Sequence, residues 1–175
     1  MLELLLLRHA KSRWDQPGVG DHDRDLAPRG ENAAKRMGVL LRDLGLRPDL
    51  VLCSTARRAA RTWEIVAAKL CKAPPLAYDD ALYLASPERM IELVRQRGGA
   101  AQRLLLVGHD PGMHRLGRAL AATGDAALRA ELAAKFPTAA LAQIALDLPS
   151  WSAFNGQAGE LRGFWRPRQL GTSSD

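Results

Sequence analysis

The sequence predicts a three-layer α/β/α domain whose sheet is mostly parallel. Three short apolar runs, at residues 4–7, 50–53 and 104–107, are the first observation. Continuous runs of this length suit strands that are buried on both faces, as the strands of parallel sheets are. The second observation is that segments with a helical spacing of apolar residues separate the runs. This alternation favours helices on both faces of the sheet, connected by right-handed crossovers.

The first two helices are predicted by their apolar faces. Ala33, Met37 and Leu41 recur at helical spacing after the first strand, and Gly45 marks the end of that helix. A segment that contains Trp63 repeats in the same way after the second strand. Each helix therefore follows a strand, as a parallel sheet requires.

Two further helices are predicted from N-terminal signals. Ser86 precedes Pro87, which suits an N-cap followed by proline at the first helical position. Asp110 and Pro111 repeat this arrangement after the third strand. His109 immediately precedes this second motif, so the same turn can be either a plain helix start or part of a functional site.

The C-terminal part of the chain has a different pattern. Residues 141–146 and 161–165 are predicted as two strands separated by turn residues, and we expect them to form an antiparallel hairpin at the edge of the sheet. Residues 1–170 are expected to form a single domain, and residues 171–175 a frayed tail. The polar, aperiodic segment 18–29 is predicted to be a loop over the carboxyl ends of the parallel strands.

The composition excludes several classes of protein. The 175-residue chain has a net charge of +6 at pH 7, but its arginines are spread along the sequence rather than gathered in a block. We therefore expect neither nucleic acid nor a membrane as partner, although dispersed positive charge attracts anionic substrates. Two cysteines are too few for a disulfide framework, and Cys53 ends an apolar run, which indicates a buried thiol. The apolar N-terminus is too short to span a membrane and lacks the features of a signal peptide, so we expect a cytoplasmic protein.

Chemically informative side chains follow the three predicted parallel strands. Arg8 and His9 follow the first strand, Arg57 and Arg58 the second, and His109 the third. The carboxyl ends of parallel strands share one edge of the sheet, so we expect these residues to meet there. Arginine forks match phosphate oxygens, a neutral histidine is a competent nucleophile, and a second histidine can donate a hydrogen bond to developing charge. The pattern predicts a site that handles phosphate.

A metal site is the main chemical alternative, because His9, His22, His109 and Asp110 are all possible ligands. An arginine beside His9 would repel a cation, and the sequence has no His-x-x-x-His or Cys-x-x-Cys spacing. It also has no Gly-x-x-x-x-Gly-Lys loop and no Gly-x-Ser-x-Gly elbow. We therefore expect no metal and no cofactor, and neither a P-loop NTPase nor a serine hydrolase.

Residues 7–14, Leu-Arg-His-Ala-Lys-Ser-Arg-Trp, resemble the signature of the histidine phosphatase superfamily, which includes the phosphoglycerate mutases. Ala10 stands where many members carry glycine, and in this the chain is similar to the SixA-like phosphohistidine phosphatases. Matches to that subgroup continue in order along nearly the whole chain, at residues 21–26, 29–30, 48–49, 54–62, 82–83, 107–112 and 138–142. The resemblance implies a phosphatase that works through a covalent phosphohistidine.

The resemblance also implies a role for each residue of the site. His9 would become the phosphohistidine, while Arg8, Arg58 and His109 would hold the phosphoryl group. Arg57 is the rival for the position of the second arginine. The spacing around Arg58 matches the family pattern better, so we expect Arg57 to face solvent or the rim of the pocket.

Lys11 and Ser12 are expected to contact the substrate. The general acid is where the chain departs from the family, because many relatives carry a glutamate after the second helix and this region offers Asp79 and Asp80 instead. Neither aspartate lies in a recognisable motif. A site without a positioned acid should favour leaving groups that depart without help from a proton donor, such as the imidazole of phosphohistidine.

The leading hypothesis is a phosphatase that removes the phosphoryl group from phosphohistidine on a partner protein. A phosphatase for small phosphate esters would use the same pocket with a different rim. A phosphoglycerate mutase is disfavoured, because the chain is too short for the segments that enclose the substrate of those enzymes. The alternative from another class is a phosphate-binding signalling module without turnover, and His9 counts against it because a binder needs no nucleophile.

Overall fold

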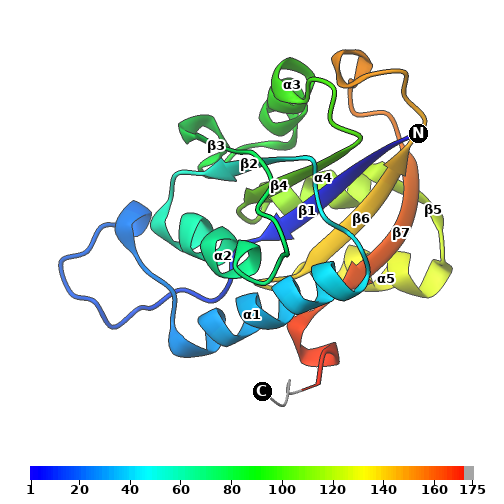
Figure 1. Ribbon diagram of the computed structural model, residues 1–175. Coiled ribbons are helices and arrows are strands. Elements are labelled where there is room, and N and C mark those ends of the chain that lie inside the picture. The colour runs from blue at the N-terminus through cyan, green and yellow to red at the C-terminus, as the bar shows by residue number, and fades with distance from the viewer. Residues whose placement is uncertain (172–175) are drawn as a thin grey trace.

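In the computed structural model, which describes residues 1–171, a seven-stranded sheet lies between two layers of helices (Figure 1). The strands are β1 (Leu2–Arg8), β2 (Leu50–Ser54), β3 (Leu76–Asp79), β4 (Arg103–Gly108), β5 (Ala121–Gly124), β6 (Leu141–Leu146) and β7 (Gly159–Trp165). The α-helices are α1 (Pro28–Asp43), α2 (Arg57–Ala67), α3 (Pro87–Arg97), α4 (Gly112–Leu120) and α5 (Ala126–Ala134). Short 3-10 turns include η1 (Asp21–Asp23), η2 (Asp80–Leu82) and η4 (Pro167–Gln169).

The strand order is β3-β2-β4-β1-β6-β7-β5, which confirms the predicted fold class. The four strands from β3 to β1 run parallel to their neighbours, and β6 pairs with β1 and β7 in antiparallel fashion. The three predicted parallel strands and the antiparallel pair are therefore present. Strands β3 and β5 were not predicted from the sequence, and β5 lies beyond β7 as the last strand on that side.

Alternate residues of β1 face opposite layers of the domain. Leu5 and Leu7 pack with Met37 of α1 and Trp63 of α2. Leu4, Leu6 and their neighbours face the core under α3, α4 and α5, where Leu93 and Leu116 lie. All four leucines of the run are fully buried. A buried leucine cut back to alanine costs about 2–5 kcal/mol of stability, so β1 is a rigid support for the residues that follow it.

The helix ends agree with the sequence signals at two of three positions. Gly45 follows α1 with φ +65°, a conformation that glycine adopts readily. The Ser86 hydroxyl accepts from the backbone N–H of Arg89 at 3.2 Å and caps α3. The prediction for Asp110 is wrong: α4 begins at Gly112, and Asp110 makes no capping bond because its carboxylate lies toward Arg8 instead.

Gly30 lets α1 approach the segment after β1. A Cβ at this position would collide with the backbone of Lys11, whose carbonyl also accepts from the Ala27 N–H at 2.9 Å. This contact fixes the loop of residues 12–27 to the start of α1. The predicted loop 18–29 thus contains the turn η1, and its last two residues already belong to α1.

Three further predictions concern Cys53, membrane-spanning segments and the C-terminal tail. Cys53 is buried as predicted, and burial raises the pKa of its thiol. Within residues 1–171, no helix is long and apolar enough to cross a membrane. The predicted frayed tail begins at Gly171, and residues 172–175 lie outside the described residues.

Candidate active site

The two histidines meet because β1 and β4 are neighbouring parallel strands. Arg8 pairs with Gly108 in the register of these strands, and the His9 N–H donates to the Gly108 carbonyl at 3.0 Å. The rings of His9 and His109, the residues that follow, have centroids 5.1 Å apart. Both side chains are buried at the carboxyl edge of the sheet, where the sequence predicted them.

The hydrogen bond of His9 defines which ring nitrogen is reactive. Its Nδ1 lies 2.7 Å from the carbonyl oxygen of Ala10. A carbonyl can only accept, so Nδ1 carries the proton and Nε2 keeps its lone pair. Burial, together with the charges of Arg58 and Arg8, lowers the pKa of His9 to about 3, although the hydrogen bond to the Ala10 carbonyl by itself raises it. The ring is therefore neutral at pH 7, the state in which a histidine is a nucleophile.

His109 is neutral for a similar reason and is held by Ser54. Burial first, and then the charge of Arg58, lower the pKa of His109 to about 3. Its Nε2 lies 2.7 Å from the Ser54 hydroxyl oxygen, which already accepts from the Ala56 N–H at 3.2 Å. The hydroxyl can thus donate its own proton to Nε2, which leaves the ring proton on Nδ1. This buried Nδ1 has no acceptor among the described residues, so it can donate to an anion beside His9.

Arg58 enters the site from the first turn of α2. Its side chain is almost fully buried, and its two terminal nitrogens donate to the backbone carbonyl and the carboxylate of Asp21, at 2.6 and 3.1 Å. Arg57 points outward and pairs with Asp25 at 3.4 Å and Glu64 at 3.8 Å on the exposed surface. Of the two arginines, the structure therefore brings Arg58 to the histidines, as predicted.

Asp21 binds Arg58 and is itself held by two other hydrogen-bond donors. Its carboxylate accepts from the Tyr83 hydroxyl, from Arg24 at 2.5 Å and from Arg58. These partners, the tyrosine hydroxyl first, lower the pKa of Asp21 far below its usual range, so the carboxylate is ionised. The same hydrogen bond raises the pKa of Tyr83. The tyrosine ring also lies edge-on to His109, with centroids 5.4 Å apart, and forms one wall of the site.

Arg8 is held by other partners than Arg58 is. Its Nη1 donates to the carbonyl oxygen of Phe136 at 2.8 Å and lies 3.8 Å from a carboxylate oxygen of Asp110. Its Nε is buried without an acceptor in the described protein. Arg8, His9, Arg58 and His109 are called the His–Arg cluster below.

Thr62 ties the loop after His9 to helix α2. Its hydroxyl accepts from the Ala10 N–H at 2.9 Å and donates to the carbonyl of Arg58 at 2.7 Å. The bond fixes the Ala10 carbonyl that orients His9, and Thr62 is fully buried. The threonine thus couples the nucleophile to the helix that carries Arg58.

The other predicted site residues lie elsewhere. Ser12 is buried, and its hydroxyl accepts from Arg24 at 3.0 Å, so it supports the loop. Lys11 lines a pocket on the other side of Arg8. Asp79 caps η2 through the Ala81 N–H and pairs with Arg97 at 2.5 Å, and Asp80 accepts from the Thr55 hydroxyl at 2.5 Å. Neither aspartate has a contact to the His–Arg cluster among its hydrogen bonds.

Several residues of the site had been missed as functional positions. Asp21 and Tyr83 lie inside motifs that resemble the family, but no role was assigned to them, and Ser54 and Thr62 flank the Arg58 segment. For Ser54 and Thr62 the signal was a polar residue at an otherwise apolar strand end or helix face.

As for metal ligands, residues 1–171 contain no group of three or more histidine, cysteine, aspartate or glutamate side chains that could hold an ion.

The geometry suits phosphoryl transfer. A neutral imidazole with a free Nε2 lies near Arg8 and Arg58, whose guanidinium groups are held by hydrogen bonds, and a second imidazole can donate beside it. Guanidinium groups complement phosphate oxygens and stabilise the charge that develops when a phosphoryl group moves. The cluster therefore has both a nucleophile and preorganised positive charge.

Comparison with known proteins agrees with this chemistry. Residues 4–83, which contain Arg8, His9 and Arg58, match the family model described as histidine phosphatase superfamily, branch 1. An uncharacterised protein of Mycobacterium tuberculosis is 38% identical over 93% of this chain and 100% of its own. A crystal structure of a candidate phosphohistidine phosphatase SixA from Agrobacterium tumefaciens is 32% identical, covers 95% of this chain and 98% of its own, and has a TM-score of 0.79.

A second SixA structure, from Nakamurella multipartita, is similar to 95% of this chain and 96% of its own at 27% identity, with a TM-score of 0.82. The structure of a protein histidine phosphatase SixA complexed with tungstate, 20% identical, has the same fold with a TM-score of 0.77. The likeness to the two SixA structures covers 95% of this chain in each case. The chain belongs to the histidine phosphatase superfamily and has the fold of its SixA-like members.

Proposed function

We propose that the protein is a phosphohistidine phosphatase that carries the phosphoryl group on Nε2 of His9. Membership of the superfamily implies a phosphatase, and the state of His9 supports a covalent mechanism. The observation that carries the proposal is a neutral, buried histidine with a free Nε2 beside Arg8 and Arg58. A module that only binds phosphate has no need of such a nucleophile, so turnover is favoured over binding.

The first step forms a bond between Nε2 of His9 and phosphorus while the bond from phosphorus to the leaving group breaks. His9 keeps the proton on Nδ1, where the Ala10 carbonyl stabilises the positive charge that the phosphorylated ring acquires. In the second step, water attacks phosphorus, inorganic phosphate leaves with both protons of the water, and neutral His9 is regenerated. Arg8, Arg58 and His109 hold the phosphoryl oxygens through both steps.

The surroundings of the cluster support phosphohistidine as substrate. Breaking an alkyl phosphate needs an acid to protonate the leaving oxygen, whereas the leaving imidazole of phosphohistidine can already carry a proton and depart neutral. Asp21 is ionised, and Asp79 and Asp80 are engaged in other hydrogen bonds. Asp110 lies beside Arg8, with a carboxylate oxygen 3.8 Å from Nη1. Each of these four carboxylates is thus engaged by hydrogen-bond donors or by a cation of the protein.

The experiment compares kcat/KM for matched phosphohistidine and phosphoserine peptides. We expect the phosphohistidine peptide to be hydrolysed at least about a hundredfold faster, the range in which general acid catalysis operates. The Asp79→Asn, Asp80→Asn and Asp110→Asn variants are assayed alongside. Equal rates on both peptides, or an aspartate whose loss selectively abolishes ester hydrolysis, would establish the alternative, a phosphatase for small phosphate esters.

A further inference from the structure

A second concentration of positive charge lies in a pocket that Arg8 lines and His9 does not. A pocket of about 750 Å³ is lined by Arg8 at the end of β1 and by Lys11 after it, by α1, by the segment before β6, and by residues 166–169 after β7. Seven of its lining residues are basic and none is acidic. We call it the basic pocket. Its volume lies within the range of about 300–1,000 Å³ that is typical of small-molecule sites.

Most of these cations lack a partner in the protein. Of the seven, Arg166 pairs with Glu131 at 3.0 Å, and Arg8 has the long contact to Asp110. The other five make no ion pair with the described carboxylates of residues 1–171, and they are Lys11, Arg29, Arg36, Lys135 and Arg168. Elsewhere on the surface arginines are commonly paired, as Arg61 is with Glu31 and Glu64. The basic pocket is thus a local excess of unneutralised charge.

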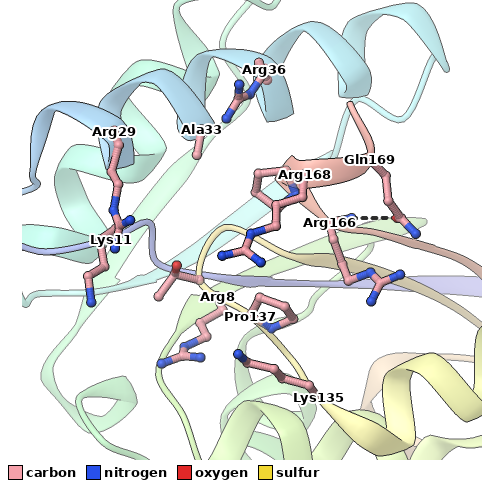
Figure 2. A pocket seen from close by; sticks show the side chains of 12 residues that line it. Arg8, Lys11, Arg29, Ala33, Arg36, Lys135, Pro137, Arg166, Arg168 and Gln169 are labelled. Carbon is pink, nitrogen blue, oxygen red and sulfur yellow. Dashed lines mark hydrogen bonds between the residues drawn. The ribbon is translucent and has the colours of Figure 1, made fainter. Parts of the chain in front are cut away.

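The side chains converge on one space. Figure 2 shows Arg29 and Lys11 toward one end of the pocket and Arg168 reaching in from η4, with Arg8 and Lys135 along the opposite wall. Nε atoms of three lining arginines, Arg8, Arg36 and Arg166, are buried and find no acceptor in the described protein. Native structures satisfy nearly all of their buried donors, so these atoms point to an acceptor that residues 1–171 do not supply.

We infer that the basic pocket binds a small molecule with two or more phosphate groups. Like charges held within one Debye length, about 8 Å at physiological salt, repel one another, and an anion removes that cost. A single phosphate carries about −1.5 to −2 charges at pH 7, which is too few for five unpaired cations. Guanidinium forks match phosphate oxygens in pairs, so a polyphosphate suits the lining better than a carboxylate of equal charge.

Arg8 makes the pocket relevant to turnover, because it belongs to both the basic pocket and the His–Arg cluster. Two sources of the ligand share this chemistry. It can be the distal phosphates of the molecule whose phosphoryl group His9 receives, or a separate polyphosphorylated compound. This inference goes beyond the proposed function, since the site can bind whether or not phosphohistidine is the substrate.

The test is titration calorimetry with inorganic tripolyphosphate and, separately, inorganic phosphate. We expect one tripolyphosphate per chain, bound about tenfold or more tightly than phosphate, because several charge-assisted contacts form at once. The Arg36→Gln/Arg168→Gln double variant should weaken tripolyphosphate binding by about tenfold or more. The matched control is Arg42→Gln/Arg118→Gln, which removes the same charge from exposed positions outside the pocket and should change affinity by less than about twofold.

Equal affinity for phosphate and tripolyphosphate, equal losses in both double variants, or no binding to the folded wild type would overturn the inference. An assay with an aryl phosphate then separates the two sources. Tripolyphosphate that competes with the aryl phosphate, with an inhibition constant raised by the pocket variant, identifies the distal phosphates of a substrate. Tripolyphosphate that changes kcat without competing identifies a separate ligand. Binding that persists in a protein without turnover would refute the proposed function alone.

Discussion

In the His–Arg cluster each arginine is held by acceptors of the protein itself, whereas in the basic pocket most cations have none. Arg58 donates to Asp21 and Arg8 to the Phe136 carbonyl, so both guanidinium groups are fixed before a substrate arrives. In the basic pocket, Arg36 and Arg168 pair with no carboxylate among the described residues. Catalysis needs preorganised charge aimed at a transition state, while binding needs charge that a ligand can neutralise. The difference indicates that the two sides of Arg8 serve different purposes.

Removing the nucleophile should give the largest effect. His9→Ala should lower turnover of an aryl phosphate by roughly 10⁴-fold or more, because no second group can form the covalent intermediate. The measurement is kcat for the purified variant, with circular dichroism to show that it is folded. Arg36→Gln is the control, since it changes the other side of Arg8. Wild-type turnover in His9→Ala would end the assignment of His9.

The buried histidines should make stability depend on pH. The folded-state pKa values of His9 and His109 are lowered to about 3, below the ordinary value of 6.5, so the unfolded chain binds more protons between these values. Stability is therefore fully present above about pH 6.5 and declines as the pH falls toward 3, by at most about 1.4 kcal/mol per pH unit for each histidine. Urea unfolding at pH 7 and pH 5 measures this difference in the free energy of unfolding. A free energy of unfolding that is equal at the two values would contradict the neutral, buried state.

The choice between neighbouring arginines gives the next effect. Arg58→Ala should reduce kcat/KM by about a hundredfold or more, as loss of one oxyanion donor does. Arg57→Ala should change it by less than about threefold, because that side chain makes exposed ion pairs. The two variants are assayed with the same aryl phosphate. A larger loss of kcat/KM in Arg57→Ala than in Arg58→Ala would show that Arg57, and not Arg58, binds the phosphoryl group.

Asp21 should act as a positioning residue for Arg58. Asp21→Asn keeps the backbone carbonyl that accepts from Arg58 but loses the charge, so kcat should fall by about tenfold, less than for Arg58→Ala. The Asp21→Asn/Arg58→Ala double variant should be no slower than Arg58→Ala alone, because both changes act through one guanidinium group. Fully additive losses would show that Asp21 acts independently of Arg58.

The smallest effect is expected from the basic pocket. Arg36→Gln/Arg168→Gln should leave kcat/KM for a small aryl phosphate within about twofold of wild type, because such a substrate does not reach the unpaired cations. The assay is run at constant ionic strength, since surface charge also steers anionic substrates. A loss comparable to that of Arg58→Ala would mean that the two sides of Arg8 form one catalytic site.

The sequence predicted the parts of the molecule that are dictated by local patterns. Continuous apolar runs identified β1, β2 and β4, and their common carboxyl edge placed His9 beside His109. It missed β3 and β5, which have only four residues each and have one buried residue between them, so that no long apolar run marks them. It missed the role of Asp21 because the contact with Arg58 joins residues 37 positions apart. The basic pocket was invisible for the same reason, since dispersed arginines become neighbours only in the folded chain.

The proposed mechanism requires a covalent phosphoryl intermediate on His9, and this intermediate can be trapped. The protein is mixed with a substrate labelled in its phosphoryl group and quenched within one turnover in alkaline denaturant, which preserves phosphohistidine. Peptide mapping should find the label on the peptide that contains His9, and none on the corresponding peptide of His9→Ala. Turnover without a labelled protein, or a label on His109 or another residue, would contradict the account.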